Sequence, residues 1–452
     1  MGKLVIAQSA IELSARWTEL RPHLEQQRFY HSPCRFNVVP AGRRSGKSEI
    51  AKRKLVRAAM KGGTTGLPGR FFASAPTYGQ AKRIYWNDLK LLVPDWMKAG
   101  SPSESELVIR MVNGAELHVF GMDKPERIEG SPWDGGILDE YGNMKPEAWG
   151  ANVRPALSDR KGWCDLIGVP EGRNHYYELA LKAESDFKAQ YVRSSWGYFH
   201  WPSSDILDAE EIAMAKADLD ELTFRQEYEG SFISFEGRAY YVFDSRFHAS
   251  PLEYDPNRQI AFCFDFNVDP GVCAIVQEQL LPSDEYGTGV IGEVYIERNS
   301  NTPAVCRKLI EDWGDHNGRI VCYGDATGGS RGSAKVQGSD WDLIKATLNP
   351  HFGQRISYNV PSANPPERAR VNAVNSRLMS AAGNIRMIVD GRRAPHVVKD
   401  LDGVILLKGG SGEIDKKATP KLSHISDGLG YYVAKEFPIM PQVMQRVGMK
   451  GT

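Results

Sequence analysis

The chain has 452 residues, 41% hydrophobic and 25% charged, and its 56 basic side chains balance its 56 acidic ones. This length favours two or three domains, and the zero net charge leaves any contact with nucleic acid to local basic patches. No apolar run approaches the roughly 20 residues that span a bilayer, and no signal peptide is visible, so we expect no membrane segment and a cytoplasmic location.

Cysteine and histidine spacing gives no sign of a disulfide framework or a zinc site. The six cysteines show no C-x-x-C spacing, and four of them lie in apolar runs, so we expect buried, reduced thiols. The ten histidines form no H-x-x-x-H pair, and we therefore expect no structural zinc.

Helical and strand patterns alternate through the first half of the chain. Helical spacing covers 11–30 and 46–63, and β-rich runs cover 35–41, 69–77, 106–121, 135–142 and 161–172. We read each β-rich run as one strand that ends in a turn or loop. This alternation predicts a mostly parallel sheet with functional loops at the carboxyl ends of its strands.

The second half opens differently, after an irregular aromatic stretch and one helix at 208–230. The following runs are predicted as strands at 259–268, 271–280, 289–298, 319–325 and 385–391, with helices at 303–318 and 366–383. Three adjacent strands followed by alternation are the element order of the RNase H-like fold, which has a mixed sheet. We therefore predict domains at 1–195 and 257–452, joined by a linker subdomain at 196–256.

A phosphate-binding loop is predicted at Ala41–Ser48, "AGRRSGKS". In such a loop, N–H groups at a helix N-terminus bind phosphate oxygens, a lysine reaches the β- and γ-phosphates, and a hydroxyl binds Mg²⁺. Ala41 replaces the usual first glycine, and a basic helix start without a ligand is the alternative. The residues that we expect to bind ATP are Gly42, Arg43, Arg44, Ser45, Gly46, Lys47 and Ser48, with Ser48 on the metal.

An acidic pair follows the apolar run in "GGILDEYG" (135–142). Phosphoryl transfer needs one carboxylate on the metal side and one that activates water, and we assign Asp139 and Glu140 to these roles. A solvated strand end with two acids is the alternative. The order of the two motifs along the chain favours ATP hydrolysis.

Arginine and glutamine side chains are further candidates for this site. Arg43 lies within the loop, where nucleotide phosphates attract a guanidinium. Arg127, ahead of the acid pair, is expected either to reach the nucleotide of a neighbouring subunit or to form a surface salt bridge. Gln27, or equally its neighbour Gln26, is a candidate for the adenine edge, and a solvated glutamine is the alternative.

Three aspartates are candidates for a nuclease centre: Asp265 in "FCFDFNVD", Asp325 in "CYGDATG" and Asp427 in "SHISDGLGYY". Cleavage of a phosphodiester by two metals needs carboxylates that hold the ions about 4 Å apart, and oxygen ligands suit Mg²⁺ or Mn²⁺. Asp269 is either a fourth ligand or, preferably, a turn former. His424 either orients the leaving group or caps a helix.

Basic side chains near these acids are candidates for contacts with DNA phosphates, which carry no sequence information. They lie at 329–335, at 390–396 and beside an expected hairpin at 409–415. No zinc finger or basic zipper is visible, so we expect a partner to choose the DNA site.

Together these motifs resemble the large terminase subunit of tailed double-stranded DNA bacteriophages, over nearly the whole chain. The segments that carry the resemblance are "AGRRSGKS", "APTYGQ", "ILDEYG", "GVPEGRN", "FRQEYEGSF", "FCFDFN", "CYGDATG" and "HISDGLGYY". The resemblance implies an α/β architecture in which a P-loop NTPase domain of the RecA/ASCE type, with a mostly parallel sheet, is linked to an RNase H-like endonuclease domain with a mixed sheet.

The resemblance also implies a function in viral genome packaging. The implied partners are double-stranded DNA, a small terminase subunit and the portal protein of the procapsid, on which the subunits form a homo-oligomeric ring, expected to be a pentamer. In isolation we expect a monomer. The implied cofactors are ATP and Mg²⁺, with Mn²⁺ as an alternative at the nuclease site. The implied location is the host cytoplasm and, transiently, the procapsid, but not the mature virion.

Two other functions remain open at this point. An ATP-dependent helicase or repair nuclease would also carry a P-loop and an acid pair, but it usually has a second ATP-binding lobe, which the second half lacks. An inactive, prophage-derived DNA-binding remnant is the other alternative. The presence of Lys47, Glu140, Asp265, Asp325 and Asp427 argues against it.

Overall fold

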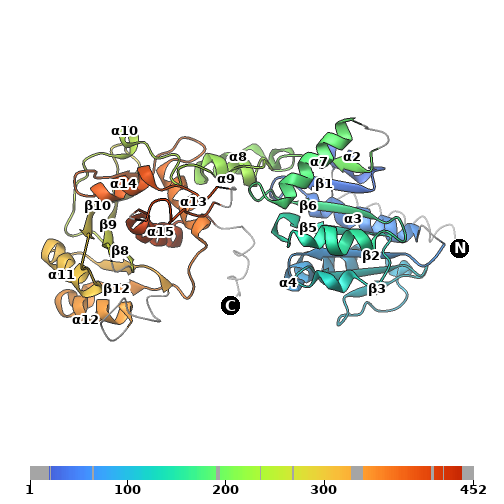
Figure 1. The fold of residues 1–452 in the computed structure, drawn as a ribbon, viewed down its shortest axis with the longest axis horizontal. Helices are drawn as coiled ribbons and strands as arrows, with labels where there is room; N and C mark the ends of the chain where they lie inside the picture. Colours follow the sequence, from blue (N-terminus) through green and yellow to red (C-terminus); the bar gives the residue numbers. More distant parts are fainter. Residues whose placement is uncertain are drawn as a thin grey trace. The chain divides into compact units, whose positions relative to one another are not determined.

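The computed structural model describes residues 20, 22–63, 66–189, 194–234, 236–266, 269–326, 339–408, 412–420 and 422–439. The chain divides into two compact units, each with its own sheet (Figure 1). The first unit extends to Ile212 and includes Arg225–Ile233, and the second contains Ala213–Phe224 and continues from Ser234. No helix within these described ranges is long and apolar enough to cross a membrane. The bounds of the three predicted domains stay predictions.

The first unit contains a seven-stranded sheet in the order β3-β4-β2-β5-β6-β1-β7. All neighbouring strands are parallel except β3 and β4. The strands are β1 Phe36–Pro40, β2 Arg70–Ala75, β3 Val108–Arg110, β4 Glu116–Gly121, β5 Gly135–Asp139, β6 Trp163–Gly168 and β7 Trp196–Tyr198. The prediction of a mostly parallel sheet for this half is confirmed.

The helices of the first unit connect these strands. They are α2 Leu24–Tyr30, α3 Lys47–Lys61, α4 Tyr78–Ala81, α5 Asn87–Leu92, α6 Arg154–Ala156 and α7 His175–Ala189. Short 3₁₀ turns are η2 Asp95–Met97, η3 Pro125–Ile128, η4 Tyr141–Asn143 and η6 Ser203–Asp205, and π-helical turns are η1 Lys82–Trp86 and η5 Ala148–Val153. Helix α3 ends at Lys61 because Gly62 follows with φ 89°, in the left-handed region.

The two faces of the first sheet bury separate apolar clusters, because neighbouring residues of a strand point to opposite faces. In β1, Val39 packs in a cluster with α2, α3 and α5, whereas Val38 packs in a cluster with α7. In β5, Ile137 and Leu138 divide in the same way. Since both faces are covered, β1 and β5 are buried along their whole length, which accounts for their continuous apolar sequences.

The second unit contains a six-stranded sheet in the order β12-β11-β8-β9-β10-β13. Strands β8, β9 and β10 form an antiparallel meander, and β11, β12 and β13 pair in parallel with their neighbours. The strands are β8 Ile260–Asp265, β9 Gly271–Leu280, β10 Tyr286–Ile296, β11 Ile320–Tyr323, β12 Ile356–Asn359 and β13 Met387–Val389. This mixed sheet confirms the predicted meander with parallel additions.

The helices of the second unit cover this sheet. They are α10 Ser245–His248, α11 Thr302–Trp313, α12 Asp340–Phe352, α13 Glu367–Leu378, α14 Pro395–Gly403 and α15 His424–Glu436, with a 3₁₀ turn η8 Gly353–Arg355. Phe262 and Ile275 of the sheet pack with Leu309 of α11 and Ile344 of α12. Helix α15 packs against β8 and β9 (Figure 1). All six cysteines are free and buried, as predicted.

Turns and caps divide two segments that the sequence analysis reads as single elements. The predicted strand at 106–121 is two antiparallel strands, β3 and β4, because Gly114 with φ 81° reverses the chain between them. The predicted helix at 208–230 is two helices, α8 Ala209–Asp218 and α9 Glu221–Glu227. Asp220 ends the first and begins the second, since its Oδ1 accepts the N–H of Thr223 at 3.1 Å.

Four further elements differ from the prediction. Strand β7, which the sequence analysis places in the linker, pairs with β1 in the first sheet. Helix α12 and strand β12 were not predicted, although Ser339 and Asp342 form a capping box that marks the start of α12. Of the predicted helix at 11–30 the structure describes α2 from Leu24 onward, with Leu20, Pro22 and His23 not helical, and residues 11–19 and 21 lie outside the described ranges.

Candidate functional site

The predicted phosphate-binding loop connects the carboxyl end of β1 to the N-terminus of α3. Two of its residues, Arg44 with φ 59° and Gly46 with φ 74°, are in the left-handed region, which lets the chain turn sharply into the helix. Gly46 is the N-cap of α3 and no side chain caps it. The first N–H groups of the helix have no intrahelical acceptor, so the loop presents donors and a positive helix end to an anion.

Side chains from other segments donate hydrogen bonds to backbone carbonyl oxygens of the loop. The Ser45 carbonyl oxygen accepts hydrogen bonds from Gln26 Nε2 at 3.0 Å and from Trp201 Nε1 at 2.9 Å. Ser203 Oγ donates to the Arg43 carbonyl oxygen at 2.6 Å. Because Gln26, Trp201 and Ser203 are all buried, these bonds fix the loop geometry before any ligand binds.

The structure places Gln26 at the loop, but not Gln27. Gln26 is fully buried and serves the loop backbone, whereas Gln27 is exposed and donates to the Pro22 carbonyl oxygen at 2.8 Å. The solvated reading of Gln27 therefore fits the structure, and its contact with adenine stays a prediction.

Asp139 lies at the carboxyl end of β5 and is fully buried. Its Oδ2 accepts hydrogen bonds from Ser48 Oγ at 2.7 Å and from Tyr85 Oη at 2.8 Å. Burial and the nearby Glu140 raise the pKa of Asp139, and the Lys47 ammonium opposes them. The Ser48 hydroxyl and the Asp139 carboxylate are thus adjacent oxygen donors, which is the ligand chemistry that Mg²⁺ prefers.

Glu140 takes a backbone conformation that is rare for a residue with a side chain, φ 52° and ψ 45°. Its Oε1 lies 3.6 Å from Lys47 Nζ, and its Oε2 accepts the N–H of Val169 at 3.3 Å. Gly168 allows this turn, since a Cβ there would lie 3.2 Å from the Cα of Glu140. The predicted phosphate-binding lysine, Lys47, and the predicted catalytic acid, Glu140, are therefore brought together.

The predicted arginines have different surroundings. Arg43 Nε donates to Glu227 Oε2 at 2.6 Å, and although burial works in the other direction, the Glu227 carboxylate raises the pKa of Arg43. Arg44 is exposed. Arg127 is exposed in η3, and no carboxylate within the described ranges pairs with it. The surface salt bridge considered for Arg127 is therefore not seen.

The three nuclease candidates come from elements that meet at one edge of the second sheet. Asp265 ends β8, Asp325 follows its parallel neighbour β11, and Asp427 lies in the first turn of α15. Helix α15 approaches β8 closely at Gly428, where a Cβ would lie 2.7 Å from the Cys263 carbonyl oxygen. This close packing places Asp427 beside the end of β8.

Asp427 is buried and is neutralised by two cations. Arg370 Nη2 lies 3.3 Å from its Oδ1, and Lys416 Nζ lies 3.1 Å from its Oδ2. The Arg370 guanidinium also lies 4.2 Å from the ring centroid of Tyr431. Burial raises the pKa of Asp427, and the attraction of Arg370 opposes that rise.

The other two candidate acids, Asp265 and Asp325, also contact polar side chains. Asp265 Oδ2 lies 3.3 Å from His424 Nδ1, and this hydrogen bond raises the pKa of His424. Asp325 Oδ1 accepts a hydrogen bond from Asn364 Nδ2 at 2.6 Å. Asp269 accepts the Ser300 N–H at 3.0 Å, and its roles as a turn former or a fourth ligand stay predictions.

The carboxylate set suits Mg²⁺ or Mn²⁺, but the described residues contain no group of three or more histidines, cysteines and acids that could hold a metal ion. Arg370 and Lys416 lie where a cation would contact Asp427. Metal binding by Asp265, Asp325 and Asp427 therefore stays a prediction. The basic segment 329–335 lies outside the described ranges.

Sequence reasoning did not single out three residues that contact these sites. Tyr85 binds Asp139 from the segment after β2, Glu227 binds Arg43 from α9, and Arg370 binds Asp427 from α13. Glu227 was within a quoted motif, "FRQEYEGSF", but nothing in the sequence linked it to an arginine about 180 residues away. A basic residue on a predicted helix, such as Arg370, gives no signal of its acid partner.

The chain is similar to known proteins both in sequence and in fold. Residues 39–247 match the family model described as "Terminase large subunit, T4likevirus-type, N-terminal". The terminase large subunit of Thermus phage G20c is 26% identical over 254 residues, which cover 47% of this chain and 49% of that protein. The corresponding subunit of Escherichia phage T5 is 26% identical over 226 residues, 48% of this chain and 49% of that protein. The chain spans about half the length of the curated relatives that it matches.

Solved structures extend the likeness in fold to the second unit. The large terminase from a thermophilic bacteriophage has a TM-score of 0.60 and 14% identity, and the match covers 92% of this chain and 99% of that one. The same protein in complex with ADP has a TM-score of 0.58, 14% identity and coverage of 91% and 98%. The resemblance to the large terminase subunit and the predicted fold class are confirmed.

Proposed function

We propose that this chain, which resembles phage large terminase subunits, is the motor subunit that packages a viral genome. ATP hydrolysis in the first unit drives double-stranded DNA into a procapsid, and the second unit cuts concatemeric DNA at the start and the end of packaging. The observation that carries this proposal is the paired geometry at the phosphate-binding loop. Lys47 lies 3.6 Å from Glu140 and Ser48 lies 2.7 Å from Asp139, all at the carboxyl edge of a mostly parallel sheet.

The residues of the loop have distinct roles in ATP hydrolysis. The N-terminus of α3 and Lys47 bind the phosphates, and Ser48 and Asp139 hold Mg²⁺, which neutralises phosphate charge when it is bound. Glu140 accepts a proton from the attacking water, and the Val169 N–H orients its carboxylate. The large terminase of the thermophilic bacteriophage, solved in complexes with ADP and with ATP-γ-S, supports nucleotide binding here.

Arg127 is our candidate for an arginine that completes the site of a neighbouring subunit. It is exposed and has no carboxylate partner in the described chain. One ATP-binding unit per chain with an arginine supplied from outside requires a ring, which we place on the portal protein, with a small terminase subunit as DNA-recognition partner. The proposed location is the host cytoplasm and, transiently, the procapsid.

DNA cleavage is assigned to Asp265, Asp325 and Asp427 of the second unit, with Mg²⁺ or Mn²⁺ as the metal. Their oxygen donors and their convergence at one sheet edge support this assignment.

The helicase alternative has less support than the packaging function. A helicase with two ATP-binding lobes would show a second parallel sheet with its own phosphate-binding loop. The second unit instead contains an antiparallel meander within a mixed sheet.

The decisive test is DNA packaging in vitro with procapsids, portal, small subunit and ATP, read as DNA protected from DNase. We expect Lys47→Ala and Glu140→Gln to lower both protected DNA and ATP turnover by roughly 100-fold or more. The exposed Glu147→Gln variant is the matched control and should retain both. Packaging by Glu140→Gln at the wild-type rate, or strand separation without uptake of intact duplex, would overturn the proposal.

A further inference from the structure

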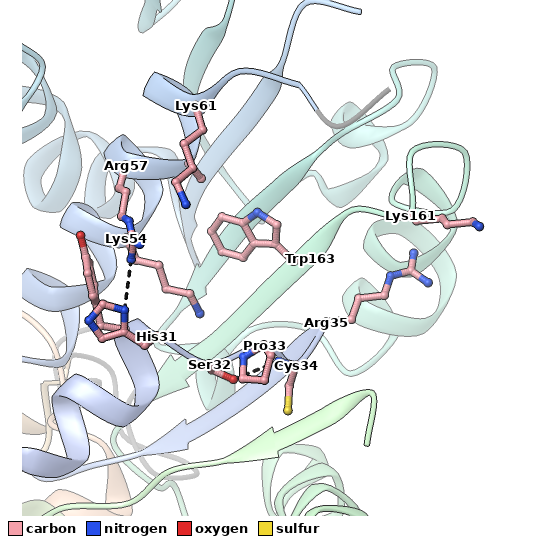
Figure 2. Close-up of a pocket in the computed structure, with 12 residues that line it drawn as sticks. His31, Ser32, Pro33, Cys34, Arg35, Lys54, Arg57, Lys61, Lys161 and Trp163 are labelled. Carbon is pink, nitrogen blue, oxygen red and sulfur yellow. Dashed lines mark hydrogen bonds between the residues drawn. The ribbon is translucent and has the colours of Figure 1, made fainter. Parts of the chain in front are cut away.

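A basic cleft lies in the first unit, at the opposite strand ends from the phosphate-binding loop. It has a volume of about 470 Å³ and opens where β1 and β6 begin. Five cationic side chains line it: Arg35, Lys54, Arg57, Lys61 and Lys161. Three of them share one face of α3 at spacings of three and four residues, and the other two precede β1 and β6 (Figure 2).

Only one of these cations is neutralised by an acid in the described chain. Lys54 Nζ lies 2.8 Å from Asp165 Oδ1, and Asp165 is fully buried behind the cleft. Asn37 Nδ2 donates to the same oxygen at 2.7 Å. This buried pair fixes the Lys54 side chain as a wall of the cleft and leaves the remaining four positive charges uncompensated.

Arg35 satisfies its donors without losing its charge. Its Nε and Nη2 bond the carbonyl oxygens of Gly162 at 2.8 Å and Leu157 at 3.0 Å, and these bonds hold the loop that carries Lys161. Burial, together with the like charge of Arg154, lowers the pKa of Arg35. Arg154 thus adds a further positive charge near Arg35.

Arg57, Lys61 and Lys161 have no carboxylate partner among the described residues, and no acidic side chain lines the cleft. The Arg57 guanidinium contacts neutral groups: its Nη1 lies 3.4 Å from His31 Nδ1, and its centre lies 5.0 Å from the Tyr30 ring. Together with Arg35, these side chains place four uncompensated cations around one cleft, and such a cluster attracts an anion.

Two aromatic side chains, Trp163 and Tyr30, also line the cleft. The half-buried Trp163 ring lies between the α3 side chains and Arg35 (Figure 2). Its position is fixed from behind, because a Cβ on Gly135 would lie 2.2 Å from the indole. Tyr30 lines the same cleft. Flat rings framed by cations are the arrangement by which proteins bind unpaired nucleotides, the base on a ring and the phosphate on the cations.

We propose that this cleft binds one unpaired nucleotide of a nucleic acid strand. The base lies against Trp163, and the phosphate is bound by Arg57, Lys61 and Lys161. A volume of this order suits a ligand of nucleotide size. A duplex, with its bases paired and stacked, offers no free ring face. The proposal does not depend on the packaging function, since none of the residues assigned to ATP hydrolysis or DNA cleavage lines the cleft.

The test is photocrosslinking of the full chain to a short single strand that contains 5-iododeoxyuridine, with ATP-γ-S on the phosphate-binding loop and peptide mapping by mass spectrometry. We expect a crosslink in the peptides of Trp163 or Tyr30. The double variant Lys61→Gln with Lys161→Asn should lower it roughly tenfold, because two phosphate contacts are lost. Both positions are exposed, so the fold should be retained. The exposed Lys182→Gln of α7 is the control and should leave the crosslink unchanged.

Three outcomes would overturn the proposal. No crosslink at Trp163 or Tyr30, or a crosslink that survives in the double variant, would show that the cleft does not bind the strand. An equally strong crosslink from the annealed duplex would show that no unpaired base is needed. Competition by inorganic phosphate or free mononucleotide at the strand's own concentration would assign the cleft to a small anion instead.

Discussion

Two buried carboxylates of the described chain, Asp139 and Asp427, are each held by specific donors a few ångströms away. Asp139 accepts hydrogen bonds from both Ser48 and Tyr85, and Asp427 lies between Arg370 and Lys416. A buried carboxylate that loses a donor bears a desolvation cost which nothing offsets. The donors around each acid are therefore the most informative positions to change.

Tyr85→Phe removes one of the two side-chain donors to Asp139 without changing the shape of the core. We expect the first unit to lose about 1–3 kcal/mol of unfolding free energy, because Asp139 stays buried with one donor fewer. Urea denaturation measures this loss. Tyr78→Phe, at a tyrosine that is 39% exposed, is the control and should be neutral. Equal stability of both variants would mean that the Tyr85 hydroxyl does not stabilise the carboxylate.

His248 predicts a pH dependence of stability in the second unit. It is buried, its Nδ1 lies 3.0 Å from both the N–H and the carbonyl oxygen of Asp244, and its Nε2 lies 3.1 Å from the Leu378 carbonyl oxygen. Burial lowers its pKa from the ordinary value of 6.5. Below that value the unfolded chain binds a proton that the folded chain does not, so unfolding free energy should fall as pH falls.

The His248→Gln variant should lose less stability than wild type between pH 7.5 and about pH 5.5, as measured by urea denaturation. The dependence of unfolding free energy on pH should become weaker but should not disappear, because burial also lowers the pKa of His316. A variant whose stability follows pH as steeply as wild type would show that His248 is not the titrating group.

At the scale of elements, two glycines of α15 provide a matched pair. A Cβ at Gly428 would lie 2.7 Å from the Cys263 carbonyl oxygen of β8, whereas a Cβ at Gly430 would have its nearest neighbour, Arg370 Cβ, at 3.4 Å. We expect Gly428→Ala to cost about 1–3 kcal/mol by moving α15 away from β8. Gly430→Ala should be neutral or stabilising by about 0.5–1 kcal/mol. Thermal unfolding measures the melting temperatures of the two variants. Equal melting temperatures would contradict the close packing of α15 against β8 at Gly428.

Hydrophobic periodicity and the order of motifs predict most of the strands and helices correctly. Buried parallel strands have continuous apolar sequences, and the connecting helices have recognisable start and stop residues. They failed where a local turn decides the outcome. Gly114 divides one apolar run into β3 and β4, and Asp220 divides one helix in two. Strand β7 has only three residues and joins the sheet through its pairing with β1, a contact that no local pattern reveals.

The residues of the candidate sites show the same difference between local sequence patterns and contacts that only the fold creates. Residues in contiguous motifs, such as Lys47 and Glu140, could be assigned from sequence and are found together. Partners that come from distant segments could not be assigned from sequence. Tyr85 meets Asp139, Glu227 meets Arg43 and Arg370 meets Asp427 only through the fold. Gln26 rather than Gln27 meets the loop because only one of two neighbours on a helix can face the core.

For the whole molecule, the proposed function places ATP hydrolysis and DNA cleavage in separate units. The first unit contains the phosphate-binding loop and acid pair, and the second contains the three aspartates. The sheets, cores and candidate residues of the two units are distinct. Inactivation of one site should therefore leave the chemistry of the other intact.

The most direct measurement follows ATP turnover and Mg²⁺-dependent cutting of supercoiled plasmid in parallel, for wild type, Lys47→Ala and Asp265→Asn, with EDTA as the metal-free control. The account predicts that Lys47→Ala loses ATP turnover and still cuts, that Asp265→Asn loses cutting and still hydrolyses ATP, and that EDTA abolishes both. Loss of both activities in either soluble, folded variant, or cutting by Asp265→Asn at the wild-type rate, would contradict it.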